Sequence, residues 1–290
     1  MNSIEQQIWG FTPEGEAVVR YTMTNAGGAS VVLSNIGAGI IAVNVPDRNG
    51  KLANVALGYD RFESYFGDGP YMGKTPGRFA NRIGEGRFTL DGKEYRLAQN
   101  SGGQHLHGGL KGFANKVWTG RVETDRVVFS LVSPDGDDKY PGEVTVEVCY
   151  DWNDDCELEI TYYAKTDAPT IINLTNHSYF NLKGESVGRA MEQELQLNAS
   201  KFLWYDKNCI PTGELVEVKG TPMDFTTAKP LARDIDADYE PLNIGHGYDQ
   251  SWAIDGYEKG KLSEAGVLSD PETGRRMRIF TTHPSAHVYA

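Results

Sequence analysis

The residues best suited to acid–base and hydrogen-bonding chemistry gather in four separated stretches of the sequence. In most of them, histidine, asparagine, arginine or aspartate lies beside glycines, where loops that carry functional side chains are expected. Imidazole, guanidinium, amide and carboxylate groups together can bind a small polar ligand and move its protons. The stretches are GRFANRIGEGRF (77–88), GGQHLHGGLKGF (102–113), NLTNHSYFNL (173–182) and IGHGYDQSWAID (244–255).

The first and fourth stretches offer hydrogen-bonding groups, and each also has a plainer interpretation. Asn81 and Arg82 sit among glycines, and a guanidinium fork suits sugar hydroxyls or carboxylates. Exposed arginines paired with an acid are common, so Arg82 also fits an ordinary surface position. In the fourth stretch Asp249 follows two glycines and Trp252 offers an apolar plate, although a turn followed by a strand explains the same residues.

Four of the six histidines lie in these stretches. On a strand, His105 and His107 point to one face, where an H-x-H pair can grip a metal ion with His177 as a third ligand. No acid or cysteine at metal-motif spacing accompanies them, so we predict no metal site. His177 lies among residues that favour a strand, and it fits either a proton-transfer group or a core histidine with satisfied ring nitrogens.

The composition narrows the class of protein and of partner. The net charge of −12 is spread along the chain without a lysine or arginine cluster, which argues against nucleic acid or an anionic membrane as a partner. The three cysteines have no CxxC spacing, which argues against a disulfide framework. Neither a basic, apolar leader nor a run long enough to cross a bilayer is present, so we expect a cytoplasmic protein.

The elements that must position these residues are strands. Alternation with period two recurs at 127–132, 143–152 and 157–166, and Asp91-Gly92 predicts a hairpin over 87–97. Helical periodicity is confined to 60–66 and part of 229–239. Because no linker, charge block or repeat divides the 290 residues, we predict a single, mainly antiparallel β-domain over 1–290.

The segments GRFANRI, QHLHGG, NHSYFNL and GYDQSW, in this order, resemble the signature segments of the aldose 1-epimerase family, also called galactose mutarotases. The resemblance runs from about residue 15 to the last residue. It implies an all-β fold, a large antiparallel β-supersandwich. It also implies the interconversion of α and β anomers of aldohexoses such as galactose and glucose, without a cofactor or metal.

The resemblance assigns roles position by position. His177 would be the general acid that protonates the pyranose ring oxygen. Asn81, Arg82 and His107 would hold the sugar around that oxygen, and Asp249 would accept hydrogen bonds from other hydroxyls. Histidine suits the first task because its ordinary pKa lies near neutrality, and a positive charge on Arg82 nearby would make the imidazolium a stronger acid.

The last residues depart from the family pattern. TTHPSAHVYA (281–290) matches a T-x-x-P-x-x-Q-x-Y motif with His287 in the glutamine place, and the glutamate that serves as the family's general base lies beyond this motif. Gln250 and His283 stand where many relatives have histidine and glutamate. We therefore expect a C-terminally incomplete β-sandwich that lacks its last strands, with an unpaired edge and poor solubility.

Two other functions fit the same residues. A sugar-binding module of this fold would keep the pocket without the proton relay. A hexose-6-phosphate 1-epimerase would need a basic cluster for the phosphate. Outside Arg82, the only basic run is RRMR (275–278), so this alternative ranks below the others.

Overall fold

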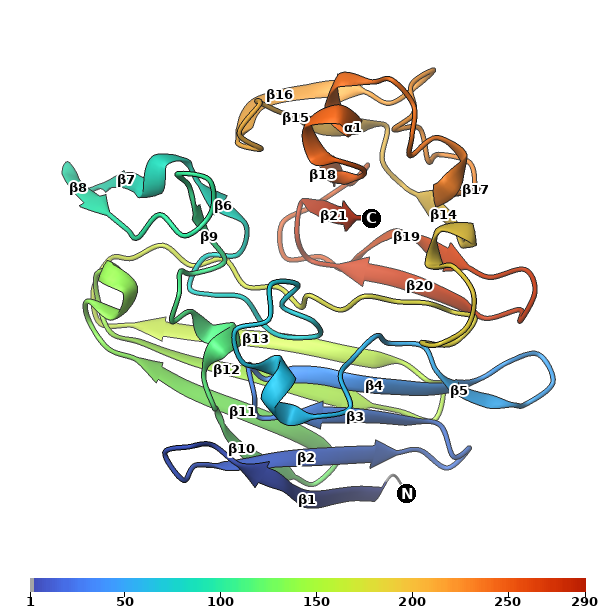
Figure 1. The fold of residues 1–290 in the computed structure, drawn as a ribbon, viewed down its shortest axis with the longest axis horizontal. Helices are drawn as coiled ribbons and strands as arrows, with labels where there is room; N and C mark the ends of the chain where they lie inside the picture. The colour runs from blue at the N-terminus through green and yellow to red at the C-terminus, as the bar shows by residue number, and fades with distance from the viewer. Residues whose placement is uncertain (1–2) are drawn as a thin grey trace. The chain divides into compact units, whose positions relative to one another are not determined.

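The computed structural model describes residues 3–290, which form two compact units built almost entirely of β-strands (Figure 1). The first unit holds residues 3–46 and 50–180, and the second holds 47–49 and 181–290. Each unit has its own sheets and core, and each is described by itself. The single domain over 1–290 stays a prediction.

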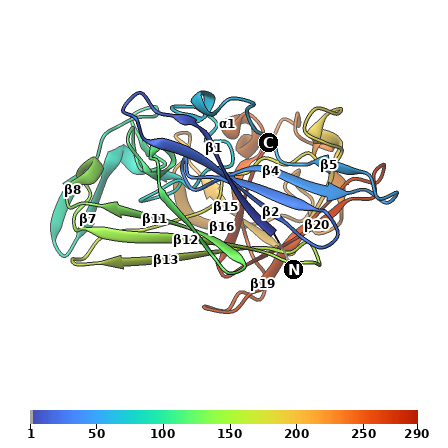
Figure 2. The same cartoon turned by 90° about the horizontal axis from the view of Figure 1, so that it is seen from below.

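Two antiparallel sheets make up most of the first unit (Figure 2). One has the order β1-β2-β3-β4-β5, and the other has the order β10-β11-β12-β13. The strands are β1 (Ser3–Phe11), β2 (Ala17–Thr24), β3 (Ser30–Ser34), β4 (Gly39–Pro46), β5 (Leu52–Asn54), β10 (Thr119–Glu123), β11 (Arg126–Ser133), β12 (Val144–Trp152) and β13 (Leu158–Thr166).

The predicted alternation is confirmed in these strands. On β12 the face formed by Val144, Val146, Val148 and Tyr150 is buried, and β11 and β13 follow the predicted ranges closely. The hairpin is also present, as β7 (Arg87–Leu90) and β8 (Lys93–Arg96), with positive φ angles of 50° and 76° at Asp91 and Gly92. Both turn residues thus adopt the conformation that this tight reversal requires.

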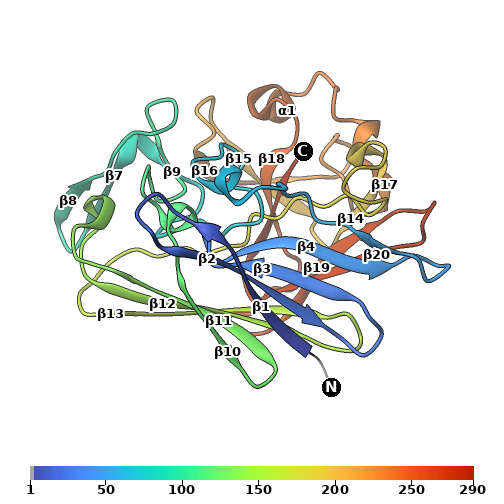
Figure 3. The same ribbon diagram turned by 60° about the horizontal axis from the view of Figure 1, so that its bottom comes forward.

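The core of the first unit lies between its two sheets, whose strands cross one another in Figure 3. Tyr21 on β2 meets Phe129 on β11 edge to face, with ring centroids 5.3 Å apart. The buried hydroxyl of Tyr150 donates to the carbonyl of Ala38 at 2.7 Å. Such aromatic pairs stabilise a sandwich more than the burial of their apolar surface alone would. The hydrogen bond of Tyr150 gives its buried hydroxyl the partner that a polar group in the core requires.

Short elements connect the strands of the first unit. The predicted helical turn at 60–66 is the 3-10 helix η1 (Phe62–Tyr65). The remaining ones are β6 (Arg82–Ile83), η2 (Gly84–Gly86), β9 (His105–Leu106), η3 (Phe113–Asn115) and η4 (Asp137–Lys139).

The second unit also contains two four-stranded antiparallel sheets, with orders β17-β14-β19-β20 and β16-β15-β18-β21. The elements are η5 (Ala190–Glu192), β14 (Glu194–Leu197), β15 (Lys201–Tyr205), β16 (Pro211–Glu217), β17 (Lys229–Pro230), η6 (Leu231–Arg233), α1 (Glu240–Gly245), β18 (Asp249–Ala253), β19 (Ser263–Ser269), β20 (Arg276–Thr281) and β21 (Ser285–Tyr289). Of these, η6 lies in the range predicted to be helical, whereas α1 was not predicted. None of the helices formed by residues 3–290 is long and apolar enough to cross a membrane.

Trp252 belongs to the core of the second unit. Its side chain is fully buried, packs against Phe202, Phe225 and Tyr248, and donates its indole N–H to the carbonyl of Met223 at 3.0 Å. The interpretation of Trp252 as an apolar plate for a ligand was therefore wrong. Alternation along β18 places it on the face opposite to Asp249, where it packs inward.

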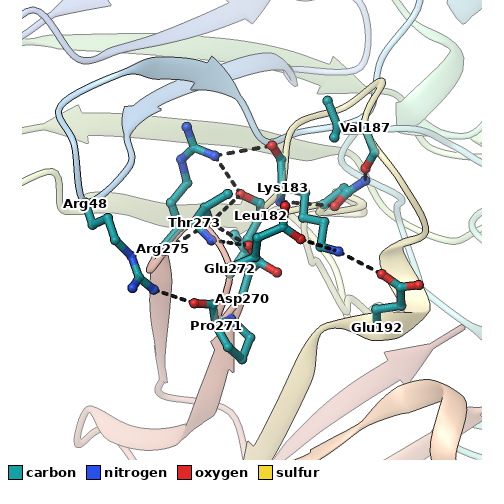
Figure 4. A network of polar contacts seen from close by, with 11 residues as sticks. Arg48, Leu182, Lys183, Val187, Glu192, Asp270, Pro271, Glu272, Thr273 and Arg275 are labelled. Carbon is teal, nitrogen blue, oxygen red and sulfur yellow. Dashed lines mark hydrogen bonds and ion pairs between the residues drawn. The ribbon is translucent and has the colours of Figure 1, made fainter.

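A polar network in the second unit accounts for the basic run at 275–278 (Figure 4). Arg275 is only 6% exposed and donates to the carbonyl of Leu182 at 2.8 Å, while Lys183 forms ion pairs with Glu192 and Glu272 at 2.7 and 3.0 Å. Farther along the run, Arg278 is paired with Glu264 at 2.8 Å. Two of the three arginines of the run are therefore engaged by carbonyl or carboxylate oxygens of the protein.

Candidate active site

The loop 77–83 is held in place by two other stretches that the sequence singled out. The amide of Ala80 donates to the carbonyl of Asn173 at 2.8 Å, and the amide of Asn173 donates to the carbonyl of Arg78 at 2.9 Å. On its other side the loop continues into β6, which pairs with β9 in an antiparallel bridge. Three separate stretches of sequence thus meet in the first unit.

Two hydrogen bonds join Asn81 and His107 where these stretches meet. The amide of Asn81 donates to Nδ1 of His107 at 3.0 Å, and the amide of His107 donates to the carbonyl of Asn81 at 3.1 Å. Since Nδ1 accepts a hydrogen bond, the neutral imidazole carries its proton on Nε2. His107 therefore presents an N–H donor from its second ring nitrogen.

Arg82 is oriented by its neighbour. Its amide donates to Oδ1 of Asn81 at 2.8 Å, and its Nη1 lies 3.4 Å from the same oxygen. Asn81 adopts a φ of +67°, a left-handed conformation that asparagine tolerates better than most residues. In this conformation its amide and carbonyl reach His107, and its side-chain oxygen reaches Arg82.

Glycine is required where the second histidine stretch approaches the loop. Gly108 has a φ of +82°, and a Cβ atom there would lie 1.7 Å from the carbonyl oxygen of Gly77. No other residue fits this contact without moving the backbone. The glycines that follow His107 in the sequence therefore allow the two segments to touch.

The backbone of His177 is anchored to residues 73–74 by two hydrogen bonds. Its amide donates to the carbonyl of Lys74 at 2.8 Å, and its carbonyl accepts from the amide of Gly73 at 3.0 Å. The expected strand around it was wrong: residues 173–182 lie outside any strand and have isolated bridges at Asn173 and Phe180. Loop 73–74 takes the backbone hydrogen bonds that a neighbouring strand would otherwise form.

The imidazole rings of His107 and His177 meet edge to face, with centroids 5.2 Å apart. Tyr71 contacts both rings, at 4.7 Å from His107 and 6.2 Å from His177, and Tyr179 lies 5.3 Å from His177. Two titratable rings fixed side by side, beside an arginine and an asparagine, form a group that can donate a proton and hold the oxygen that receives it.

Tyr71, which sequence reasoning missed, contacts two of the predicted site residues. It has a φ of +55°, which is strained for a residue with a large side chain and concentrates at functional positions. Burial, followed by the nearby Asp68 carboxylate, raises the pKa of its phenol. The dense glycines of GDGPYMGK (67–74) were the available signal.

A buried ion pair in the first unit supports the same loop. Lys74 and Asp68 have side chains that are 0% and 3% exposed, and Nζ of Lys74 also donates to the carbonyl of Tyr65 at 2.6 Å. Burial lowers the pKa of Lys74 more than the Asp68 carboxylate raises it. The pair lies beside Tyr71: Nζ of Lys74 is 5.7 Å from the centre of the Tyr71 ring.

His105 is a structural residue. Its side chain is fully buried, with Nδ1 2.7 Å from the carbonyl of Ala98 and Nε2 2.6 Å from the hydroxyl of Tyr140. The strand β9 ends at Leu106 and His107 has a φ of +51°, so the alternation behind the H-x-H geometry does not reach His107. Within residues 3–290 no group of three or more histidine, cysteine, aspartate or glutamate side chains could hold a metal ion.

The environment of His105 predicts a pH dependence of stability. Burial lowers the pKa of its imidazole below the value of the unfolded chain, so between the two values the unfolded chain binds more protons. The free energy of unfolding should therefore decrease as the pH falls below about 6.5. In the His105→Gln variant, urea unfolding between about pH 7 and pH 5 should show a shallower slope.

The control for this prediction is His283→Gln, which removes an exposed histidine. It should keep the slope of the parent protein. A slope that is the same in the parent and in His105→Gln would contradict the prediction.

Asp249 lies in the second unit, at the start of β18, and is 8% exposed. Its amide donates to Oε1 of Gln250 at 2.9 Å, and Nε2 of Gln250 donates to the carbonyl of Pro241 at 2.7 Å. Gln250 is therefore a buried residue that fixes the backbone of Asp249. The four other predicted site residues, Asn81, Arg82, His107 and His177, are brought together in the first unit.

Comparisons with known proteins place this chain in a family. The family model described as aldose 1-epimerase matches residues 19–290. The chain belongs to the aldose 1-epimerase family. Galactose mutarotase from Bos taurus is 38% identical over 289 residues, which are 100% of this chain and 82% of the bovine one. Aldose 1-epimerase from Escherichia coli K12 is 35% identical over 279 residues, covering 96% and 80% of the two chains.

Solved structures agree with the aldose 1-epimerase assignment. An aldose epimerase homologue from C. elegans superposes with a TM-score of 0.83 at 28% identity, covering 100% of this chain and 82% of that one. Galactose 1-epimerase from Lactobacillus acidophilus gives 0.81 at 27% identity, covering 93% and 78%. The family resemblance and the all-β fold class predicted from the sequence are confirmed.

Proposed function

We propose that this chain interconverts the α and β anomers of aldohexoses, with galactose and glucose as substrates, by acid–base catalysed opening and closure of the pyranose ring. Membership of the aldose 1-epimerase family supports the reaction. The observation that carries the assignment to residues is the contact of the His107 and His177 rings beside Asn81 and Arg82.

The two histidines have different parts in the proposed reaction. His177 donates a proton to the ring oxygen as the bond between that oxygen and C1 breaks. His107 accepts the amide of Asn81 at Nδ1 and so carries its proton on Nε2, and this N–H donates to the ring oxygen or a neighbouring hydroxyl. Arg82 supplies further donors without changing its own charge.

The protons balance over one cycle. Opening the ring consumes one proton at the ring oxygen and releases one from the C1 hydroxyl, which becomes a carbonyl. Rotation about the C1–C2 bond then exposes the other carbonyl face, and closure reverses both transfers. We assign no residue to the removal of the C1 hydroxyl proton, and Asp249 is proposed to accept hydrogen bonds from other sugar hydroxyls.

The partners of the arginines in the second unit argue against a phosphate site there. Free hexoses are therefore better candidate substrates than hexose 6-phosphates. Arg275 is bound to backbone carbonyls and Arg278 to Glu264, so two of the three arginines of RRMR already have partners. A phosphate site generally needs several donors that converge on one anion. We therefore expect galactose 6-phosphate to be a poorer substrate than galactose.

Polarimetry tests the proposal directly. Freshly dissolved α-galactose should approach its equilibrium rotation faster in the presence of the protein, at a rate proportional to protein concentration, and α-glucose should behave similarly. Calorimetry on the same samples measures sugar binding. If the protein bound the sugar but the rate equalled that in buffer alone, the chain would be a sugar-binding module and not an enzyme.

A further inference from the structure

A row of hydrogen bonds in the second unit ends on the carboxylate of Asp249. The hydroxyl of Tyr205 lies 2.9 Å from Oγ of Ser251, and that Oγ lies 3.0 Å from Nδ1 of His287. Nε2 of His287 lies 2.8 Å from Oδ1 of Asp249. Four side chains thus form one continuous polar row.

Strand register explains why these four side chains meet. The strands β15, β18 and β21 are neighbours in one sheet, and Ser251 pairs directly with His287 across β18 and β21. Asp249 lies two residues before Ser251 on β18 and therefore points to the same face. The Tyr205 ring stacks on the His287 ring at 6.5 Å and an angle of 19°. The row is a product of the sheet and not of a flexible loop.

The hydrogen bonds of this row have a defined direction when His287 is neutral. An ionised carboxylate can only accept, so Nε2 of His287 must carry the proton that is donated to Asp249. Nδ1 is then an acceptor, which requires the Ser251 hydroxyl to donate to it. The Tyr205 hydroxyl, in turn, donates to Ser251. All three donors therefore point toward Asp249.

We propose that His287 is a positioning residue for Asp249, which it holds in the orientation that accepts hydrogen bonds from sugar hydroxyls. This inference rests on the proposed function, because it assigns the sugar contact to Asp249. His287 acts through the carboxylate and takes no part in proton transfer to the ring oxygen. Its side chain is 32% exposed and that of Asp249 is 10% exposed, so the carboxylate is the more buried partner of this bond.

The donor pattern of the row predicts which residue can replace His287. Glutamine offers one carbonyl acceptor for Ser251 and one N–H donor for Asp249, the same pattern as the Nε2–H imidazole. Leucine approximates part of the ring volume but offers neither group. His287→Gln should therefore act as the conservative variant and His287→Leu as the disruptive one.

Mutarotation kinetics with galactose test the proposal. We expect His287→Leu to raise KM about tenfold while kcat changes less than about threefold, because a bond to a charged group that aids binding is lost. His287→Gln should keep KM within about twofold of the parent. In the Asp249→Asn background, His287→Leu should have little further effect, since the two residues act as a unit.

Three results would overturn the positioning role. They are an unchanged KM in His287→Leu, a fall in kcat as large as the rise in KM, or a His287→Gln variant as impaired as His287→Leu. Failure of the proposed function is a separate result, because the parent protein would then not accelerate mutarotation at all. In that case the Kd for galactose, measured by calorimetry in the same variants, still tests His287.

The tautomer of His287 provides a measurement independent of activity. Long-range nitrogen–proton NMR spectra of the parent protein, assigned by comparison with His287→Gln, should show the Nε2–H form of the neutral ring. Ser251→Ala should increase the Nδ1–H population, since Nδ1 loses its donor. A neutral ring that is protonated on Nδ1 in the parent protein would overturn the direction of the row.

Discussion

Replacing His177 by asparagine should lower kcat for galactose mutarotation by about 10²–10⁴-fold, the usual contribution of one positioned proton donor. Asparagine can donate a hydrogen bond to the ring oxygen but cannot transfer a proton at neutral pH. KM should change much less than kcat, because the loss falls on the transition state. Polarimetry over a range of galactose concentrations separates the two parameters.

The fold should tolerate this substitution. The amide of His177 donates to the carbonyl of Lys74 and its carbonyl accepts from the amide of Gly73, and both backbone bonds remain when the side chain is replaced. The thermal midpoint of the variant should therefore stay within a few degrees of the parent, since the His177 side chain is only partly buried.

The matched control is His246→Asn. It makes the same substitution at an exposed residue with a φ of +56°, a conformation that asparagine accepts well. Its mutarotation rate should equal that of the parent. If His177→Asn retained more than about a tenth of the parent kcat, the role of His177 as the proton donor would be excluded.

The strands of the first unit were predictable because their residues obey a local rule. Val144, Val146 and Val148 repeat with period two, and Asp91-Gly92 is a turn signal that acts within a few residues. The segment around His177 carries similar residue types, yet it is not a strand. Its backbone partners are Gly73 and Lys74, about a hundred positions earlier, and no local pattern encodes that pairing.

The candidate site likewise contains some residues that sequence motifs predict and others that only the fold brings together. The motifs identified Asn81, Arg82, His107 and His177, and the structure brings these four residues together. Tyr71 and the pair of Lys74 with Asp68 were not predicted, because a lysine in a polar loop gives no sign that it will be fully buried. The histidine at 287 was visible as a departure, but its bond to Asp249 depends on the pairing of β18 with β21.

Lys74→Met should lower the free energy of unfolding by about 3–5 kcal/mol, because it leaves the buried carboxylate of Asp68 without its counter-charge. The same change removes the donor to the carbonyl of Tyr65. Urea unfolding at neutral pH measures the loss. Lys261→Met is the matched control, since that lysine pairs with Glu258 at the surface and should change stability by less than about 0.5 kcal/mol.

The double variant Lys74→Met with Asp68→Asn separates the charge from the packing. Asparagine retains an oxygen that can accept from the amide of Met72, which now donates to Asp68 at 2.8 Å, but it carries no charge. The double variant should therefore recover most of the stability that the single variant loses. If the double variant were as unstable as Lys74→Met, the lost stability would come from the lysine's own contacts and not from the unpaired charge of Asp68.

The direction of the Lys74 pKa supports the recovery. Burial lowers that pKa more than Asp68 raises it, so desolvation outweighs the attraction within the pair. Replacing both charges then removes two desolvation costs along with one attraction, which is why neutral replacements of buried pairs are often tolerated. Two hydrogen bonds of loop 68–74 do not use the lysine ammonium: the Asp68 side chain accepts from the amide of Met72, and the carbonyl of Lys74 accepts from the amide of His177. Because the double variant keeps an acceptor for each of these two amides, it should show mutarotase activity close to that of the parent.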